Sequence, residues 1–249
     1  MVGEDQCQTG SSWLIERSPD AVASFAPELL AWLRDELPSV KNMAGVFPGH
    51  GGAPGHPLYR QAETPFSGGS DHIILSDPTV GIPTPMLGQW PDRYYHTSAD
   101  TPERTDPDSL ARAGTLAAAY AYWIAGAGTW EAIALGYEMT ARFKARIVRL
   151  ARNAALSTLG QSDGAGLSGS VVDLDRRLAY HLDRQKVALA SLERLAPVEC
   201  FVTDMVTEAE SAVQRELRWA AGAAGLQSAT LGLVEGLQSA TQELSVSDR

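Results

Sequence analysis

The sequence contains few cysteines and few aromatic residues. Its two cysteines, Cys7 and Cys200, lie far apart in a chain of 249 residues, and neither belongs to a CxxC or CxxH pattern. This argues against a thiolate metal site and against a disulfide framework. Aromatic residues make up only 7% of the chain, so alanine and leucine must fill most of the interior.

Basic residues are also scarce. Twenty Lys and Arg against 30 Asp and Glu give a formal net charge of -10, and such a charge repels both nucleic acid and an anionic membrane surface. We therefore expect no nucleic-acid partner. Residues 113–130 are uncharged, but glycines interrupt them, and the helix-favouring part is shorter than a bilayer core. We expect no membrane span and no membrane partner.

A signal peptide is not recognisable at the beginning of the sequence. Residues 1–5 carry acidic side chains and lack the basic and apolar stretches that such a peptide requires. Because a signal peptide could lie upstream, the compartment is left open.

Proline is almost absent from the second half of the chain. Thirteen of the 14 prolines stand at or before Pro107, and only Pro197 lies beyond it. The first part predicts a mixture of strands and helices, and the second part is predicted to be helical almost throughout. In the first part we expect strands at 11–17 and 82–90, helices at 20–37 and from Asp106-Pro107 to about Ala125, and a functional loop at 45–69.

The helical part has a leucine stripe and a short repeat. The stripe at helical spacing comprises Leu174, Leu178, Leu182, Leu189 and Leu192. Three glycines in residues 161–170 predict a loop before it, and Pro197 permits a further helix after it. Gly-Leu-Gln-Ser-Ala-Thr occurs at 225–230 and again at 236–241, a spacing close to three helical turns. We expect a hairpin or small bundle whose partner surface is either the first part of the chain or another subunit.

Candidate chemistry centres on the histidines, four of which lie in the first part. His96 follows Tyr95 in a loop before a helix start, where a neutral imidazole could bind zinc or simply be a hydrogen-bonded loop histidine. In Ser70-Asp71-His72, which follows a glycine pair, the backbone could pass close to a ligand, or a polar side chain could simply cap a short helix. The run Gly-His-Gly-Gly at 49–52 is similar to the oxyanion loop of esterases, but no GxSxG elbow accompanies it, which argues against a serine hydrolase.

Four motifs occur in a characteristic order. They are Met1-Val2-Gly3, Ser70-Asp71-His72, Gly81-Ile82-Pro83 and Tyr95-His96-Thr97-Ser98-Ala99-Asp100-Thr101. In this order they resemble the C-terminal half of the zinc-dependent aminopeptidases, a di-zinc peptidase clan that also includes glutamate carboxypeptidase and, more distantly, glutaminyl cyclase. The resemblance covers residues 1–127, and the last motif is the most specific.

The resemblance implies the α/β fold class, with a partial three-layer α/β/α zinc-peptidase domain at residues 1–128 and an all-helical region at residues 129–249. In the family, two zinc ions and a bridging water hydrolyse N-terminal peptide bonds. Carried onto this sequence, His96 resembles the last zinc ligand, Tyr95 resembles the tyrosine whose hydroxyl stabilises the oxyanion, and Asp71 resembles a carboxylate beside the metal ions. His50 and His56 are candidates for substrate binding, because their loop is the expected contributor to substrate preference.

The same resemblance implies that parts of the site are missing. The family's Asp ligand precedes Met-Val-Gly, which here begins at Met1, and the other ligands and the general base would lie further upstream. A catalytic zinc site needs about three protein ligands, so we expect a fragment or truncated gene product that is inactive alone. Two alternatives stay open: a non-catalytic helical module for interaction or homo-oligomerisation, and acyl transfer of the glutaminyl cyclase kind, which would favour Trp where Tyr95 stands. The expected partners are a peptide substrate and, through the helical tail, a second copy of the chain.

Overall fold

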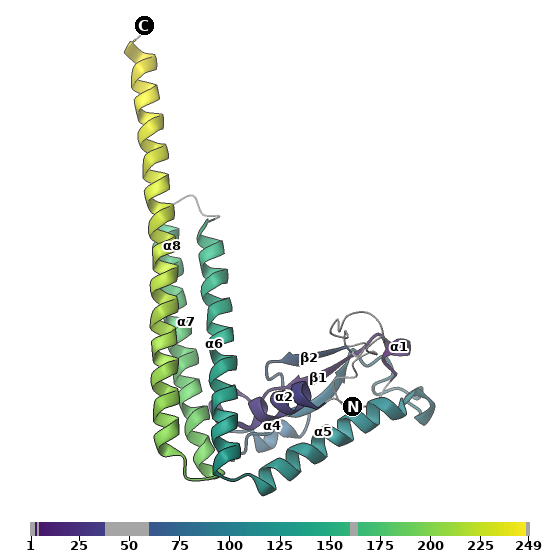
Figure 1. Ribbon diagram of the computed structural model, residues 1–249. Helices are drawn as coiled ribbons and strands as arrows, with labels where there is room; N and C mark the ends of the chain where they lie inside the picture. Colours follow the sequence, from purple (N-terminus) through teal and green to yellow (C-terminus); the bar gives the residue numbers. More distant parts are fainter. Residues whose placement is uncertain (1–2, 4, 38–59, 160–163, 248–249) are drawn as a thin grey trace, which may run out of the picture. The chain divides into compact units, whose positions relative to one another are not determined.

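The computed structural model describes residues 3, 5–37, 60–159 and 164–247 (Figure 1). The chain divides into two compact units, each described here by itself. The first consists of Met1–Leu135 and Ala188–Glu199, and the second consists of Gly136–Val187 and Cys200–Arg249.

The first unit is organised around a small mixed sheet with the strand order β2-β1-β3. The central strand is β1 (Ser12–Glu16), which pairs in parallel with β2 (Gln61–Thr64) and antiparallel with β3 (Met86–Trp90). The apolar run Trp-Leu-Ile suits β1 to this central position. The predicted α/β character of the first part is therefore confirmed, as a three-stranded sheet with helices.

Strand β2 lies inside the segment predicted to be a loop. Its sequence, Gln-Ala-Glu-Thr, is polar and only 4 residues long, so it carries no strand signal of its own. Pairing with β1 makes it a strand: Leu14 lies opposite Ala62, and Trp13 N donates to Arg60 O at 2.9 Å. The loop prediction is wrong for residues 61–64, whereas residues 38–59 lie outside the described part.

Strand β3 is shorter than predicted. It begins at Met86 rather than at residue 82, because Pro83 and Pro85 have no N–H to offer to a neighbouring strand. Ile82 instead closes a turn, in which its N–H donates to Leu75 O at 3.0 Å. Within the described residues β3 has β1 as its only partner strand, which agrees with the predicted edge position.

The helices of the first unit are short except for the long α5. Their bounds are α1 Gln6–Thr9, η1 Asp20–Val22, α2 Ala26–Glu36, α4 His72–Leu75, η2 Pro102–Arg104, α5 Pro107–Gly126 and η3 Ser191–Arg194. The start of α5 is as predicted, since the Asp106 side chain accepts hydrogen bonds from Asp108 N and Ser109 N. The helix predicted at 20–37 is divided into η1 and α2, because Pro27 in the first turn of α2 cannot donate to a preceding helical turn.

The core of the first unit forms on one face of the sheet. Trp13 and Ile15 alternate along β1 and are each 1% exposed, and they pack with Leu30 of α2 and with Ala113 and Leu116 of α5. Residues two apart on a strand point to the same face. Both α2 and α5 therefore cover the face that bears Trp13 and Ile15.

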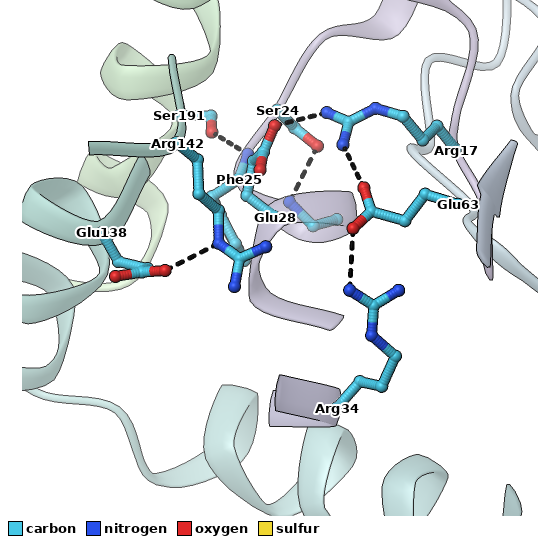
Figure 2. Close-up of polar contacts among 10 residues, drawn as sticks. Arg17, Ser24, Phe25, Glu28, Arg34, Glu63, Glu138, Arg142 and Ser191 are labelled. Atoms are coloured by element: carbon cyan, nitrogen blue, oxygen red, sulfur yellow. Dashed lines mark hydrogen bonds and ion pairs between the residues drawn. The ribbon is translucent and has the colours of Figure 1, made fainter. Parts of the chain in front are cut away.

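A cluster of ion pairs links β1, α2 and β2 (Figure 2). Arg17, directly after β1, contacts Glu28 at 2.5 Å and Glu63 at 3.3 Å, and Glu63 also contacts Arg34 at 2.9 Å. Burial lowers the pKa of Arg17, but its ion pairs with Glu28 and Glu63 outweigh this and raise the pKa above its ordinary value. The cluster joins three elements whose contacting residues lie far apart in the sequence.

The helical region contains three long helices. They are α6 Thr129–Leu159, α7 Gly164–Ala190 and α8 Glu199–Ser247. In the second unit they share one buried core, which comprises Phe143, Ile147 and Ala151 of α6, Leu174 and Leu178 of α7, and Ala209, Ala212, Val213 and Ala220 of α8. The predicted helical character of this region is confirmed.

Helix α7 begins earlier than the sequence suggests. The prediction of a loop at 161–170 is wrong from Gly164 onward, because the helix starts there despite its glycines. Glycine costs only about 1 kcal/mol in a helix, and burial of Leu174 and Leu178 further along stabilises the same helix. Tertiary packing therefore outweighs the local preference.

Residues 113–130 do not form one continuous helix. Helix α5 ends at Gly126 and α6 begins at Thr129, so the uncharged run is divided between the two helices. In the described part of the chain, no helix has the length and apolar character needed to cross a membrane.

Candidate functional site

Gly3, from the Met1-Val2-Gly3 motif, lies beside the end of β3. Gly3 N donates to Oε1 of Gln89 at 3.0 Å, and Gly3 O accepts from Asp106 N at 2.7 Å. The loop that carries His96 therefore leaves the sheet beside Gly3 and returns beside it at the start of α5. Gly3 has φ +114, and a Cβ there would lie 2.3 Å from Cδ2 of Leu110, so glycine is required at this contact.

His96 is an exposed residue in a tight turn. Both the N–H and the hydroxyl of Thr97 donate to Tyr94 O, at 3.0 and 2.7 Å, and Oδ1 of Asp92 accepts from Tyr94 N at 3.0 Å. These bonds hold His96 at φ +58, in the left-handed region that side chains other than glycine rarely adopt. Strained residues of this kind cluster at functional sites, which favours His96 among the predicted site residues.

Two aromatic rings accompany the imidazole. The Tyr95 ring stacks on the His96 ring with centroids 3.8 Å apart and an interplanar angle of 20°. Trp90, at the end of β3, meets Tyr95 edge to face at 6.3 Å. Tyr95 is 40% exposed and Trp90 is 57% exposed. The stack restricts the orientation of the imidazole, and the Tyr95 and Trp90 side chains are both exposed to solvent.

A metal site is not assembled around this turn. Among the residues that the structure describes, no three His, Cys, Asp or Glu side chains lie close enough together to hold a metal ion. The described residues around His96 therefore fall short of the three protein ligands that a catalytic zinc site needs.

The Ser70-Asp71-His72 turn is built around a carboxylate from β1. Oε1 of Glu16 accepts from Ser67 N at 2.8 Å, Gly68 N at 3.1 Å and His72 Nε2 at 3.0 Å, and Oε2 accepts from Ser67 Oγ at 2.8 Å. His72 Nε2 must be the donor, because a carboxylate only accepts. Glu16 and His72 are both buried. The segment that contains the glycine pair thus folds its backbone around the carboxylate of Glu16.

The electrostatics of Glu16 follow from this arrangement. Burial raises the pKa of Glu16, but the hydrogen bonds from Ser67, His72 and Gly68 together outweigh burial and lower the pKa below its ordinary value of 4.5. The carboxylate is therefore ionised at neutral pH. Sequence reasoning did not identify Glu16; a single acidic residue at the end of an otherwise apolar strand was the signal that could have found it.

Of the other predicted site residues, Asp71 lies in the described part of the chain. Asp71 is exposed directly before α4, and its side chain makes no capping hydrogen bond to the described residues of that helix. The His72 and Phe66 rings form a T-shaped pair, with ring centroids 5.4 Å apart. His50 and His56 lie outside the described residues, so their predicted part in substrate binding stays a prediction.

A comparison with known protein families identifies a similarity for the segment that contains the His96 turn. Residues 49–121 match the model of Peptidase family M28. The match includes the turn around Glu16, strand β3 and the His96 turn, and it ends inside α5; it supports a Peptidase family M28 domain over these residues. It covers less than a third of the chain, and Gly3 and the helical region lie outside it. No curated protein and no solved structure matches the chain.

The strain at His96 can be measured. At most positions alanine is more stabilising than glycine, but at φ +58 glycine has no Cβ penalty. We expect His96→Gly to have a free energy of unfolding about 1 kcal/mol higher than His96→Ala, as measured by urea denaturation. The same pair of substitutions at the neighbouring Ser98 should show alanine as the more stable variant. Equal or reversed stabilities at His96 would contradict the strained backbone.

Proposed function

We propose that the first unit belongs to a metallopeptidase of the aminopeptidase type, and that its described residues supply part of the active site. The family match over residues 49–121 carries this proposal, because it contains the Tyr95-His96 turn. The loop that carries the turn supports it, because this loop follows a sheet strand and both of its ends lie beside Gly3. In this proposal the three-stranded sheet is part of a larger three-layer α/β/α domain.

The described residues do not fit a complete zinc site. One imidazole stands at the turn, and no group of three candidate ligands exists in the described ranges. We therefore derive no hydrolytic step from these residues. These residues hold His96 in place. The turn fixes its backbone conformation, and the stacked Tyr95 ring restricts the orientation of its imidazole.

The proposal predicts weak zinc binding through His96 and no peptidase activity of this chain alone. In an NMR titration of the full chain with zinc, the His96 ring signals should move, with a dissociation constant well above micromolar because about three ligands are needed for tight binding. Leucine p-nitroanilide should not be hydrolysed above a zinc-only blank, and His96→Ala should remove the ring shifts.

Two results would contradict this account. Hydrolysis that a chelator stops and that His96→Ala abolishes would mean that the chain completes its own site, with ligands from residues outside the described ranges. Ring signals of His96 that ignore zinc entirely would overturn the role of His96 as a metal ligand.

A further inference from the structure

Helix α8 is much longer than the helices it packs against. It has 49 residues, against 31 in α6 and 27 in α7. Helix α7 ends at Ala190 and α8 begins at Glu199, so in an antiparallel pair the start of α7 lies level with residue 225 of α8. Residues 226–247 therefore continue past the ends of α6 and α7 (Figure 1), over roughly 33 Å at about 1.5 Å per residue.

This C-terminal segment, residues 226–247, carries a leucine stripe. Leu226, Leu233, Leu237 and Leu244 follow one another at intervals of seven, four and seven residues, which places them within a sector of about 40° on a helix. The 11-residue repeat places Leu226 and Leu237 on this stripe, because 11 residues exceed three helical turns by only about 20°. The pattern is that of a coiled-coil seam rather than of a helix that is polar on all sides.

The stripe stands at heptad spacing from two buried residues of α8. Leu226 and Leu233 stand 14 and 21 residues after the buried Ala212, and Leu237 stands 28 residues after the buried Ala209. All of these separations are multiples of seven. Between the core and the stripe these heptad positions are not all buried, since Trp219, seven residues after Ala212, is 52% exposed, and the buried Val213 and Ala220 stand one position later.

The composition of the segment suits pairing with an identical copy. Its only charged residues are Glu235 and Glu243, with no Lys or Arg, so it has no electrostatic attraction to nucleic acid or to anionic lipid. The positions that flank a coiled-coil seam, e and g, are Gln227, Val234, Thr241, Ala229, Gly236 and Glu243. Five of these six are uncharged, so two identical helices can approach with little repulsion between like charges.

We propose that residues 226–247 of α8 pair with the same residues of a second copy of this chain in a two-stranded coiled coil. In each copy the pairing begins beyond the ends of α6 and α7. Three heptads with alanine and threonine among the seam positions give a weak interface, with dissociation in the micromolar range.

Sedimentation velocity of the full chain tests this interface. The unmodified chain should sediment as a monomer–dimer equilibrium between about 1 and 100 µM. The double variant Leu233→Glu/Leu237→Glu, which places charges in the seam, should raise the dissociation constant by about tenfold or more. The charge-matched control Ser228→Glu/Gln242→Glu, at positions away from the seam, should dimerise like the unmodified chain.

The bundle itself serves as the internal check on folding. Far-UV circular dichroism and the thermal midpoint of the double variant should match those of the control, because residues 226–247 lie beyond the buried core. The proposal is overturned by a chain that stays monomeric at 100 µM, by a double variant that dimerises unchanged, or by a control that loses dimerisation equally. Binding of a monomeric chain to neutral vesicles through the same leucines would also overturn it, in favour of a lipid partner.

Discussion

Glu16→Ala is expected to lower the free energy of unfolding of the first unit by about 3 kcal/mol. The substitution removes the acceptor of Ser67 N, Gly68 N and His72 Nε2 together, and a buried donor without an acceptor costs about 1–3 kcal/mol. Urea denaturation measures the total change in the free energy of unfolding. Faster hydrogen exchange of the Ser67 and Gly68 amides would locate the effect in this turn.

Two matched variants separate hydrogen bonding from charge. Glu16→Gln retains an amide oxygen where Oε1 accepts three hydrogen bonds, and its NH2 group can donate to Ser67 Oγ, so we expect a smaller loss of about 1 kcal/mol. Asp71→Asn changes an exposed carboxylate in the same turn and should alter stability by less than about 0.5 kcal/mol. If Glu16→Ala cost no more than Asp71→Asn, the carboxylate would not be organising this turn.

The same carboxylate predicts the pH dependence of stability. The pKa of Glu16 is lower in the folded protein than its ordinary value of 4.5, because the hydrogen bonds outweigh burial. Its contribution is therefore fully present above pH 4.5 and is lost as the pH falls through the folded pKa. Between pH 7 and pH 3, urea unfolding should show a smaller decrease in the free energy of unfolding for Glu16→Gln than for the unmodified chain. An identical decrease would mean that another carboxylate is responsible for the acid sensitivity.

Glu28→Ala is expected to cost about 2–3 kcal/mol. Glu28 is only 4% exposed, and its removal leaves Arg17 with Glu63 as a more distant partner at 3.3 Å. Breaking a fully buried ion pair costs about 3–5 kcal/mol; the smaller value applies here because the Arg17 side chain is 24% exposed and partly hydrated. Thermal and urea unfolding measure the loss.

The second unit offers a control for this experiment. Arg142 and Glu138 form an ion pair one helical turn apart on α6, at 2.7 Å, and both side chains are partly exposed (Figure 2). Glu138→Ala should cost no more than about 0.5 kcal/mol. A loss at Glu28 no larger than this would show that the cluster of Arg17, Glu28, Glu63 and Arg34 adds little to stability.

Local signals in the sequence predicted local features of the structure. Asp106-Pro107 predicted the start of α5, because an N-cap side chain and a proline act on backbone groups within three residues of themselves. The leucine stripe predicted the buried face of α7 around Leu174 and Leu178, since burial follows helical periodicity. The family resemblance agrees with the later match over residues 49–121.

Features that depend on distant partners could not be predicted in this way. Strand β2 is polar and short, and it forms because β1 provides hydrogen-bond partners from nearly 50 residues earlier. The contact of Glu16 with His72 likewise joins residues separated by 56 positions. The residue types and their spacing along the sequence do not indicate which strand end will contact which turn.

The helical second half, the capped start of α5 and the motif order around His96 follow from the amino-acid sequence, because caps, prolines and apolar periodicity act on neighbouring residues. The left-handed conformation of His96 beside a stacked tyrosine, and the organisation of the Ser70-Asp71-His72 turn by Glu16, arise when the chain folds. These two features depend on contacts between residues that are distant in the sequence. A strained backbone angle at a non-glycine residue and a buried charge are both stable only when several such groups contact them together.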